Sequence, residues 1–417
     1  MSDIRNYAAV TASYWGFTLT DGALRMLVLL HFHALGYRPL DLAFLFLLYE
    51  AMGVLTNLFG GWIGARYGLR LTLFTGLGLQ VVALVLLSAL PTDLTISLSV
   101  AYVMGSQALS GIAKDLTKMS SKSAVKLVVS DDNQKMLFKW VSILTGSKNT
   151  LKGAGFFLGG FLLQSLGFQW ALLAMASGLS LVILACLRFL QNDLGKAKEK
   201  VKFTELFSKS REINYLSAAR IFLFASRDVW FVVGLPVFLA SSVGWDFNQV
   251  GAFMAIWVMG YGVVQAFVPK ILHRHTGLDS AASSAKFWGV ILAFIPAIIA
   301  LGQSNSVRHW ISGFGFEYDS VLWLIIGLII FGVVFAINSA VHSYLIVGYA
   351  DSDKASLSIG FYYMANAFGR LIGTLLSGLV YQYYGLVACL ITSAIMICMA
   401  LLFTLPLGGR MLKKERG

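Results

Sequence analysis

Apolar runs of about 20 residues recur along the whole chain, and this repetition most constrains how it can fold. A helix of that length spans a hydrocarbon core of about 30 Å, because each residue adds about 1.5 Å. The runs are continuous rather than alternating, which excludes a transmembrane β-barrel. Only 12% of the residues are charged, about half the share of an ordinary soluble domain. We therefore expect an all-α polytopic membrane protein.

The hydropathy pattern predicts about twelve membrane-spanning helices. The expected spans are 10–35, 41–65, 71–90, 96–117, 138–166, 168–190, 213–240, 247–271, 285–301, 320–346, 355–381 and 386–405. Basic residues gather in alternate connections, which places those connections and both termini in the cytoplasm. The net charge of +12 therefore reflects topology, and no nucleic-acid partner is expected.

A polar, lysine-rich stretch divides the chain almost in half. Residues 191–212 are expected to form a cytoplasmic linker between a six-helix bundle at 1–190 and a second at 213–417. Glycine-rich segments at 153–160 and 369–378 occupy corresponding places in the two halves. This two-bundle pattern is typical of the major facilitator superfamily. In the basic, glycine-rich loop that follows the second span, Ala65 stands where that superfamily usually has an acidic residue.

Several basic residues fall at membrane depth, where charge is costly and usually functional. Most of them lie about 20 Å from the cytoplasmic ends of their helices, at 1.5 Å per residue. Arg25 and Arg227 have matching depths in the first and seventh spans, as Lys152 and Arg370 have in the fifth and eleventh. The expected substrate-binding residues are Arg25, Lys148, Lys152, Arg220, Arg227 and Arg370.

Neutralisation by carboxylates is the alternative explanation for these cations. Asp21 is one helical turn from Arg25, Asp228 is adjacent to Arg227, and Glu50 lies in the second span. The basic groups outnumber these acids, so we expect the set to bind a multiply charged anion. Guanidinium groups offer bidentate hydrogen bonds to phosphate-like oxyanions. The same acids are candidates for proton coupling, with Asp21 the first choice and anion exchange the alternative energy source.

A basic stripe is predicted on the fourth span, where lysines recur at every fourth residue from Lys114 to Lys126. Lys122 and Lys126 fit a solvated cytoplasmic face. Lys114 and Lys118 lie nearer the expected cavity mouth and are candidates for steering anions toward it. His31, His33 and His342 have no cysteine or carboxylate at ligand spacing, so neither a metal nor a cofactor is expected.

Four segments that contain these charges resemble the ArsJ-type organoarsenical efflux permeases of bacterial arsenic-resistance operons. They are FTLTDGALRM at 17–26, GIAKDLTKM at 111–119, LTGSKNTLKG at 144–153 and ASRDVWF at 225–231. The resemblance implies a bacterial inner-membrane protein that exports 1-arseno-3-phosphoglycerate. It also implies a functional partner, the glyceraldehyde-3-phosphate dehydrogenase that makes this ester when arsenate replaces phosphate. Such a substrate is anionic at both ends and would suit two cationic clusters, one in each half.

Other functions remain open at this stage. An organophosphate/phosphate or other organic-anion antiporter needs the same cationic cavity, and transport assays with sugar phosphates distinguish the two. A membrane enzyme is disfavoured because no nucleophile elbow or phosphate-binding loop stands out. A signalling or scaffold protein is disfavoured because no loop is long enough to be a soluble domain. We expect a monomer whose other partner is the lipid bilayer.

Overall fold

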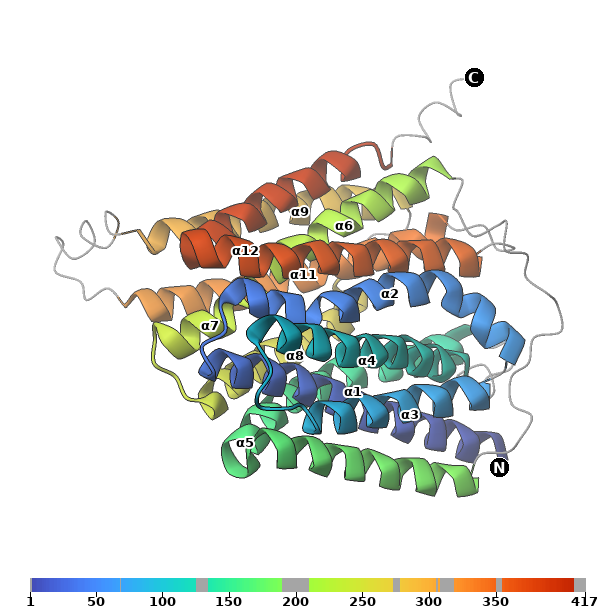
Figure 1. Ribbon diagram of the computed structural model, residues 1–417. Coiled ribbons are helices and arrows are strands. Elements are labelled where there is room, and N and C mark those ends of the chain that lie inside the picture. The colour runs from blue at the N-terminus through green and yellow to red at the C-terminus, as the bar shows by residue number, and fades with distance from the viewer. Residues whose placement is uncertain are drawn as a thin grey trace. The chain divides into compact units, whose positions relative to one another are not determined.

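The computed structural model describes residues 2–67, 69–124, 134–189, 210–272, 278–304, 307, 319–349 and 355–408. In these ranges the regular secondary structure is helical (Figure 1), which confirms the all-α class. The helices are α1 (Ser2–Ala34), α2 (Pro39–Tyr67), α3 (Leu69–Ser88), α4 (Ile96–Ala124), α5 (Gln134–Phe189), α6 (Arg211–Phe231), α7 (Gly234–Ser241), α8 (Phe247–Leu272), α9 (Leu278–Gly302), α11 (Ser320–Tyr349) and α12 (Ala355–Thr404). Residues 191–209 of the expected linker and the side chains of 60–69 lie outside the described part.

Two of these helices are each interrupted by a glycine. Gly167 in α5 has φ 74° and ψ 176°, and Gly385 in α12 has φ 75° and ψ −173°. Side chains are strongly disfavoured at such positive φ, so glycine is required at both breaks. Each break divides a long helix into two segments of about 20 residues or more, as the expected boundaries after residue 166 and before residue 386 had placed them.

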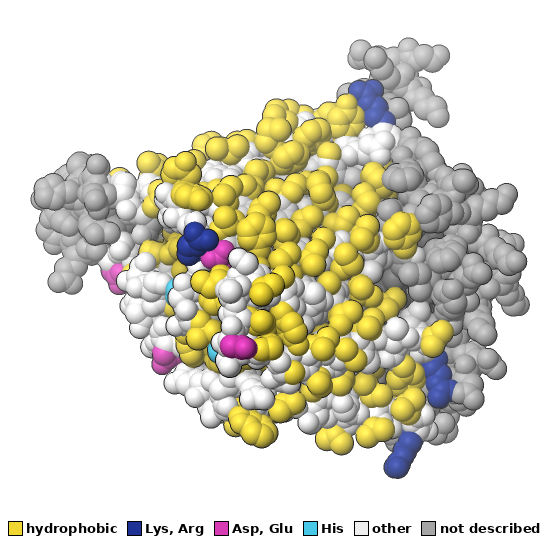
Figure 2. All heavy atoms as spheres, viewed as in Figure 1, with side chains coloured by type: hydrophobic (Ala, Val, Ile, Leu, Met, Phe, Trp, Pro, Cys, Tyr) yellow, Lys and Arg dark blue, Asp and Glu magenta, His cyan; other side chains and the backbone are white. Residues whose placement is uncertain are grey.

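The surface of the described helices suits a lipid environment. Nine helices in the described ranges are long and apolar enough to cross a membrane, with α6 and α7 together counted as one, Arg211–Ser241. Large apolar side chains such as Trp170 and Phe287 are exposed at 66% and 60%. Hydrophobic side chains dominate the face shown in Figure 2, with few charged groups among them. The chain is therefore a multi-pass membrane protein. The polar α1 is not among the nine, so its span at 10–35 stays a prediction.

Contacts divide the chain into two compact units. Unit 1 consists of Met1–Leu206 and Trp245–Gly262, and unit 2 of Phe207–Gly244 and Val263–Gly417. In unit 1, α1 packs against α5, and α4 packs against α2 and α3. In unit 2, α12 packs against α6 and α9, and α11 packs against α9. The first part of α8 thus groups with unit 1, and the expected division at the linker stays a prediction.

Glycines allow α1 and α5 of unit 1 to touch backbone to backbone. A Cβ atom on Gly155 would meet the carbonyl oxygen of Leu19, and one on Gly159 would meet that of Ala23. The two glycines are one helical turn apart, as are the two carbonyls they face. This close approach fixes the register of α5 against α1, and with it the position of the charged side chains on both helices.

Unit 2 repeats this contact between α12 and α6. Gly369 faces the carbonyl oxygen of Ile221, and Gly373 faces Ala225. Each carbonyl residue lies 202 positions after its counterpart in unit 1, and each glycine lies 214 positions after its counterpart. The two units therefore share one internal packing register, which allows their residues to be compared one by one.

This register allows the charged residues of the two units to be compared. The offset of 202 makes Arg25 and Arg227 equivalent. The offset of 214 makes Asn366 the equivalent of Lys152, one turn before Arg370. Lys152 and Arg370 thus differ by one turn in this register, and their expected match in membrane depth stays a prediction. The depth of these charged residues was counted from the ends of the expected helices, and the position of a helix end does not determine how two helices pack.

Candidate functional site

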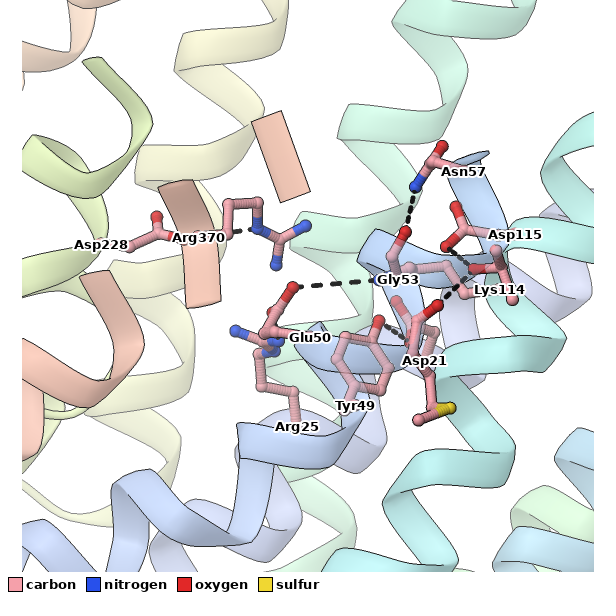
Figure 3. A network of polar contacts seen from close by, with 12 residues as sticks. Asp21, Arg25, Tyr49, Glu50, Gly53, Asn57, Lys114, Asp115, Asp228 and Arg370 are labelled. Atoms are coloured by element: carbon pink, nitrogen blue, oxygen red, sulfur yellow. Dashed lines mark hydrogen bonds and ion pairs between the residues drawn. The ribbon is translucent and has the colours of Figure 1, made fainter. Parts of the chain in front are cut away.

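Arg25 and Glu50 form a buried ion pair in unit 1 (Figure 3). Nη2 of Arg25 on α1 contacts Oε1 of Glu50 on α2, and the two residues are 7% and 0% exposed. The second carboxylate oxygen of Glu50 lies 4.0 Å from Nζ of Lys114 on α4. The Tyr49 ring lies beneath both cations, 5.2 Å from the Arg25 guanidinium carbon and 4.1 Å from Lys114 Nζ. One carboxylate is thus shared by two cations.

Asp21 pairs with residues of α2 and α5. Its Oδ1 accepts a hydrogen bond from the Tyr49 hydroxyl at 2.5 Å, and its Oδ2 lies 4.0 Å from Nζ of Lys152 on α5. Of the acids that the neutralisation alternative named, it is therefore Glu50, and not Asp21, that pairs with Arg25. Lys148 lies one turn before Lys152 and is partly buried.

A second polar cluster joins α2 and α4. Asp115 is 1% exposed and accepts a hydrogen bond from Thr56 at 2.8 Å. Nζ of Lys118 lies 3.4 Å from Asp115 Oδ1 and donates to Asn57 Oδ1 at 2.9 Å. Lys114 pairs with Glu50 of α2, so both lysines link α4 to α2. The hypothesis that they steer anions toward a cavity did not include this role. The side chains of Lys122 and Lys126 lie outside the described part of the chain.

In unit 2, the fully buried Asp228 is shared by two arginines. Nε of Arg227 donates to Asp228 Oδ1 at 2.6 Å, and Nε of Arg370 on α12 donates to Oδ2 at 3.3 Å (Figure 3). Arg227 also lies over the rings of Phe224 and Phe335, at 4.9 Å and 5.6 Å. Asp228 thus pairs with the adjacent Arg227, as the sequence suggested, but it also pairs with Arg370.

Arg220 is a buried cation without a carboxylate partner in the described ranges. It is 4% exposed, and its Nη1 donates to the backbone oxygen and the hydroxyl of Ser339 on α11, at 3.1 Å and 3.0 Å. Its guanidinium carbon lies 4.2 Å from the centre of the Phe224 ring and 5.0 Å from that of Tyr362. Among the described residues, the groups that contact this charge are neutral.

Basic groups outnumber acidic groups in each unit's described cluster. Unit 1 brings together Arg25, Lys114, Lys118 and Lys152 with Asp21, Glu50 and Asp115. Unit 2 brings together Arg220, Arg227 and Arg370 with Asp228. The surplus is one positive charge in unit 1 and two in unit 2. Such a cluster is suited to an anion that completes the neutralisation.

Sequence reasoning missed several members of these clusters. Asp115 directly follows Lys114 in the sequence. It was overlooked because the lysines at every fourth residue were interpreted as a basic stripe. Tyr49 immediately precedes Glu50 and could have been found by its position. Ser339 carried no signal, because its contact with Arg220 joins residues 119 apart in sequence. No group of three or more potential metal ligands occurs in the described ranges.

Comparison with known proteins defines the class. The sequence model of the Major Facilitator Superfamily matches residues 8–316. The chain belongs to that superfamily, and its fold is that of a membrane transporter. No curated protein matches the sequence.

Solved transporters share the fold at low sequence identity. A bacterial homologue of the iron transporter ferroportin, in an inward-facing state, has a TM-score of 0.67 at 13% identity, covering 98% of this chain and 99% of that one. A POT family transporter in complex with a thioalcohol-conjugated peptide has a TM-score of 0.68 at 17% identity, covering 96% and 95%. A POT family transporter in complex with 5-aminolevulinic acid has a TM-score of 0.71 at 18% identity, with the same coverage. At these identities the likeness concerns the fold alone.

Proposed function

We propose that this transporter exports 1-arseno-3-phosphoglycerate from the cytoplasm by alternating access and thereby confers arsenate resistance. The observation that carries the proposal is the surplus of buried and partly buried basic groups over acids in each unit. Guanidinium and ammonium groups held in apolar surroundings bind oxyanions strongly, because little water competes for them. An anion with charge at both ends matches this supply of cations.

The arsenical identity of the substrate rests on the resemblance of four segments to the ArsJ-type permeases. Those segments contain most of the cluster, including Asp21 with Arg25, Lys114 with Asp115, and Arg227 with Asp228. In this proposal the dehydrogenase supplies the ester, the protein lies in a bacterial inner membrane with both termini inside, and the monomer is the working unit. Resistance then needs no chemistry by the transporter, because the exported ester decomposes outside.

The ion pairs also bear on how export is driven. A carboxylate such as Glu50 or Asp228 competes with the substrate for the same cations. Protonating that carboxylate frees the cations, so the proton and the substrate anion favour each other's binding. An exported anion would then take its proton outward with it, against the usual proton gradient. A second anion competes with the substrate directly, so the geometry supports anion exchange over proton exchange at these pairs.

Counterflow in vesicles tests the substrate. Inverted vesicles that contain the transporter are supplied with arsenate alone, or with arsenate plus the dehydrogenase, its nucleotide and glyceraldehyde 3-phosphate. Arsenic uptake should require the complete enzyme system. Uptake of arsenate alone would overturn the organoarsenical assignment, and uptake of sugar phosphates at equal rate would favour the organophosphate antiporter.

The same vesicles test the binding residues and the coupling. Arg25→Gln and Arg227→Gln should each reduce uptake about ten- to hundredfold, the effect of losing one charge-assisted hydrogen bond. Arg→Lys should be nearly as harmful if binding is bidentate. Trapped phosphate should stimulate uptake more than a pH gradient does. If Asp21→Asn abolishes a response to pH that the parent shows, proton exchange at Asp21 replaces anion exchange.

A further inference from the structure

Two buried polar side chains in unit 2 have hydrogen-bonding capacity that the described structure does not use. Arg220 and His342 are 4% and 2% exposed, and Nε of Arg220 and Nδ1 of His342 have no hydrogen-bond partner in the described ranges. His342 follows Ser339 by three residues on α11, so it lies on the face that contacts Arg220, and the two side chains interact electrostatically. Buried polar atoms without partners are costly, which favours a ligand-binding role for the pair.

Arg220 lies close to the arginine pair that shares Asp228. Both guanidinium groups contact the ring of Phe224, whose centre lies 4.2 Å from the guanidinium carbon of Arg220 and 4.9 Å from that of Arg227. These two distances limit the separation of the guanidinium carbons to 9.1 Å. The residues are seven apart, close to two turns of α6, so both side chains leave the same face of the helix. Unit 2 therefore has two cationic positions that contact the same aromatic ring.

The second position has no basic residue at the equivalent place on α1. By the shared packing register, the equivalent of Arg220 in α1 is Thr18. Thr18 is buried and donates a hydrogen bond to its own helix, to the Tyr14 carbonyl at 2.7 Å. Arg25 and Arg227 are equivalent, so the first position occurs in both units. A cation at the second position is not required by the packing of these helices.

We propose that Arg220 and His342 form a second anion position, which binds one end of a two-ended anion while Arg227 and Arg370 bind the other. The inference rests on the proposed function for the class of substrate, and it leaves the cluster around Arg25 in unit 1 to bind the second anion of the exchange. The upper limit of 9.1 Å on the separation of the guanidinium carbons is compatible with a three-carbon chain that has an oxyanion group at each end. Because Arg220 is 4% exposed, the ligand reaches it in a more open conformation. The predicted consequence is selectivity for anions charged at both ends.

Binding to the purified, full-length transporter tests this inference. The probes are 3-phosphoglycerate, which has a phosphate and a carboxylate at opposite ends, and glycerol 3-phosphate, which has the phosphate alone. The wild type should bind 3-phosphoglycerate at least about tenfold more tightly. Arg220→Gln should remove that preference by weakening 3-phosphoglycerate about ten- to hundredfold, with glycerol 3-phosphate nearly unchanged. His342→Phe should reduce the preference in the same direction.

Controls separate a binding role from a structural one. Arg38→Gln removes an exposed arginine paired with Asp41 and should leave both affinities unchanged. Arg220→Lys keeps the charge without the planar fork and should restore part of the preference. Melting temperatures establish that each variant is folded. If Arg220→Gln weakens both probes equally, or neither, the second position is overturned.

The outcome also distinguishes this inference from the proposed function. A preference that depends on Arg220, in a protein that does not export the arsenical ester, supports the second position and refutes the assigned substrate. Export of the ester by a protein whose preference survives Arg220→Gln supports the substrate and refutes the second position. A wild type without any preference for the two-ended probe refutes the second position directly.

Discussion

Replacing Glu50 by glutamine should destabilise the protein more than any other single change of charge in unit 1. Glu50 is fully buried, pairs with Arg25 and lies 4.0 Å from Lys114. Glutamine keeps the shape of the side chain but removes its charge. Two cations are then left in apolar surroundings with no shared counter-ion, and their mutual repulsion adds to the cost.

The loss of stability in Glu50→Gln depends on the two cations that lose their carboxylate partner. Removing one partner of a buried ion pair costs about 3–5 kcal/mol. We expect the lower end for Glu50→Gln, because Lys114 is partly exposed and can turn toward water. In Arg25→Gln/Glu50→Gln the buried pair is absent, so most of the lost stability should return. The free energy of unfolding is measured in detergent micelles for the wild type, both single variants and the double variant.

Transport separates this structural effect from function. The double variant should be folded but inactive in the vesicle assay, because it lacks the guanidinium proposed to bind substrate. Wild-type stability in Glu50→Gln would refute the view that this carboxylate neutralises two cations. Normal export by the double variant would assign Arg25 and Glu50 to the scaffold alone.

Three further predictions follow from the described contacts. Asp228→Asn should lower the melting temperature of the ligand-free protein, and 3-phosphoglycerate should raise it more than in the wild type, because the anion then replaces the lost counter-ion; an equal ligand effect in both proteins would contradict this. Gly369→Ala should cost about 1–3 kcal/mol, because its Cβ would meet the Ile221 carbonyl, whereas Gly260→Ala has open space and should not destabilise; equal unfolding energies would contradict the packing argument. Lys114→Gln should impair uptake at low and at high salt, because Lys114 binds Glu50; a defect that salt abolishes would support steering instead.

Helix positions were predicted well from sequence because the signal is local. A helix that crosses lipid must satisfy its backbone internally and present apolar side chains, so length and hydropathy define it. The breaks at Gly167 and Gly385 were also predictable, because each glycine lies between two apolar runs. The basic residues at membrane depth were recognised for the same reason, because a charged residue within an apolar run can be seen from the sequence alone.

The pairing of those charges was not predictable, because it depends on which helices touch. Asp21 and Arg25 are one turn apart on α1, yet they contact Tyr49 and Glu50 of α2 respectively. The mismatch between Lys152 and Arg370 appeared only when the glycine contacts fixed the register. The sequence suggested only a metal-ligand role to test for His342. Its proximity to Arg220 could not be predicted, because it results from the packing of α6 against α11.

Comparison of the two units supports a functional reason for the shared carboxylates. Arg25 and Arg227 are equivalent, and each shares one buried acid with a second cation. The acids come from different places, however: Glu50 lies on α2, whereas Asp228 lies on α6 itself, where the equivalent residue of α1 is Met26. If the acid served only to fill a fixed packing site, equivalent positions would be expected to supply it. The same charge arrangement built from different positions instead indicates a chemical requirement, a cation pair whose counter-ion an incoming anion can displace.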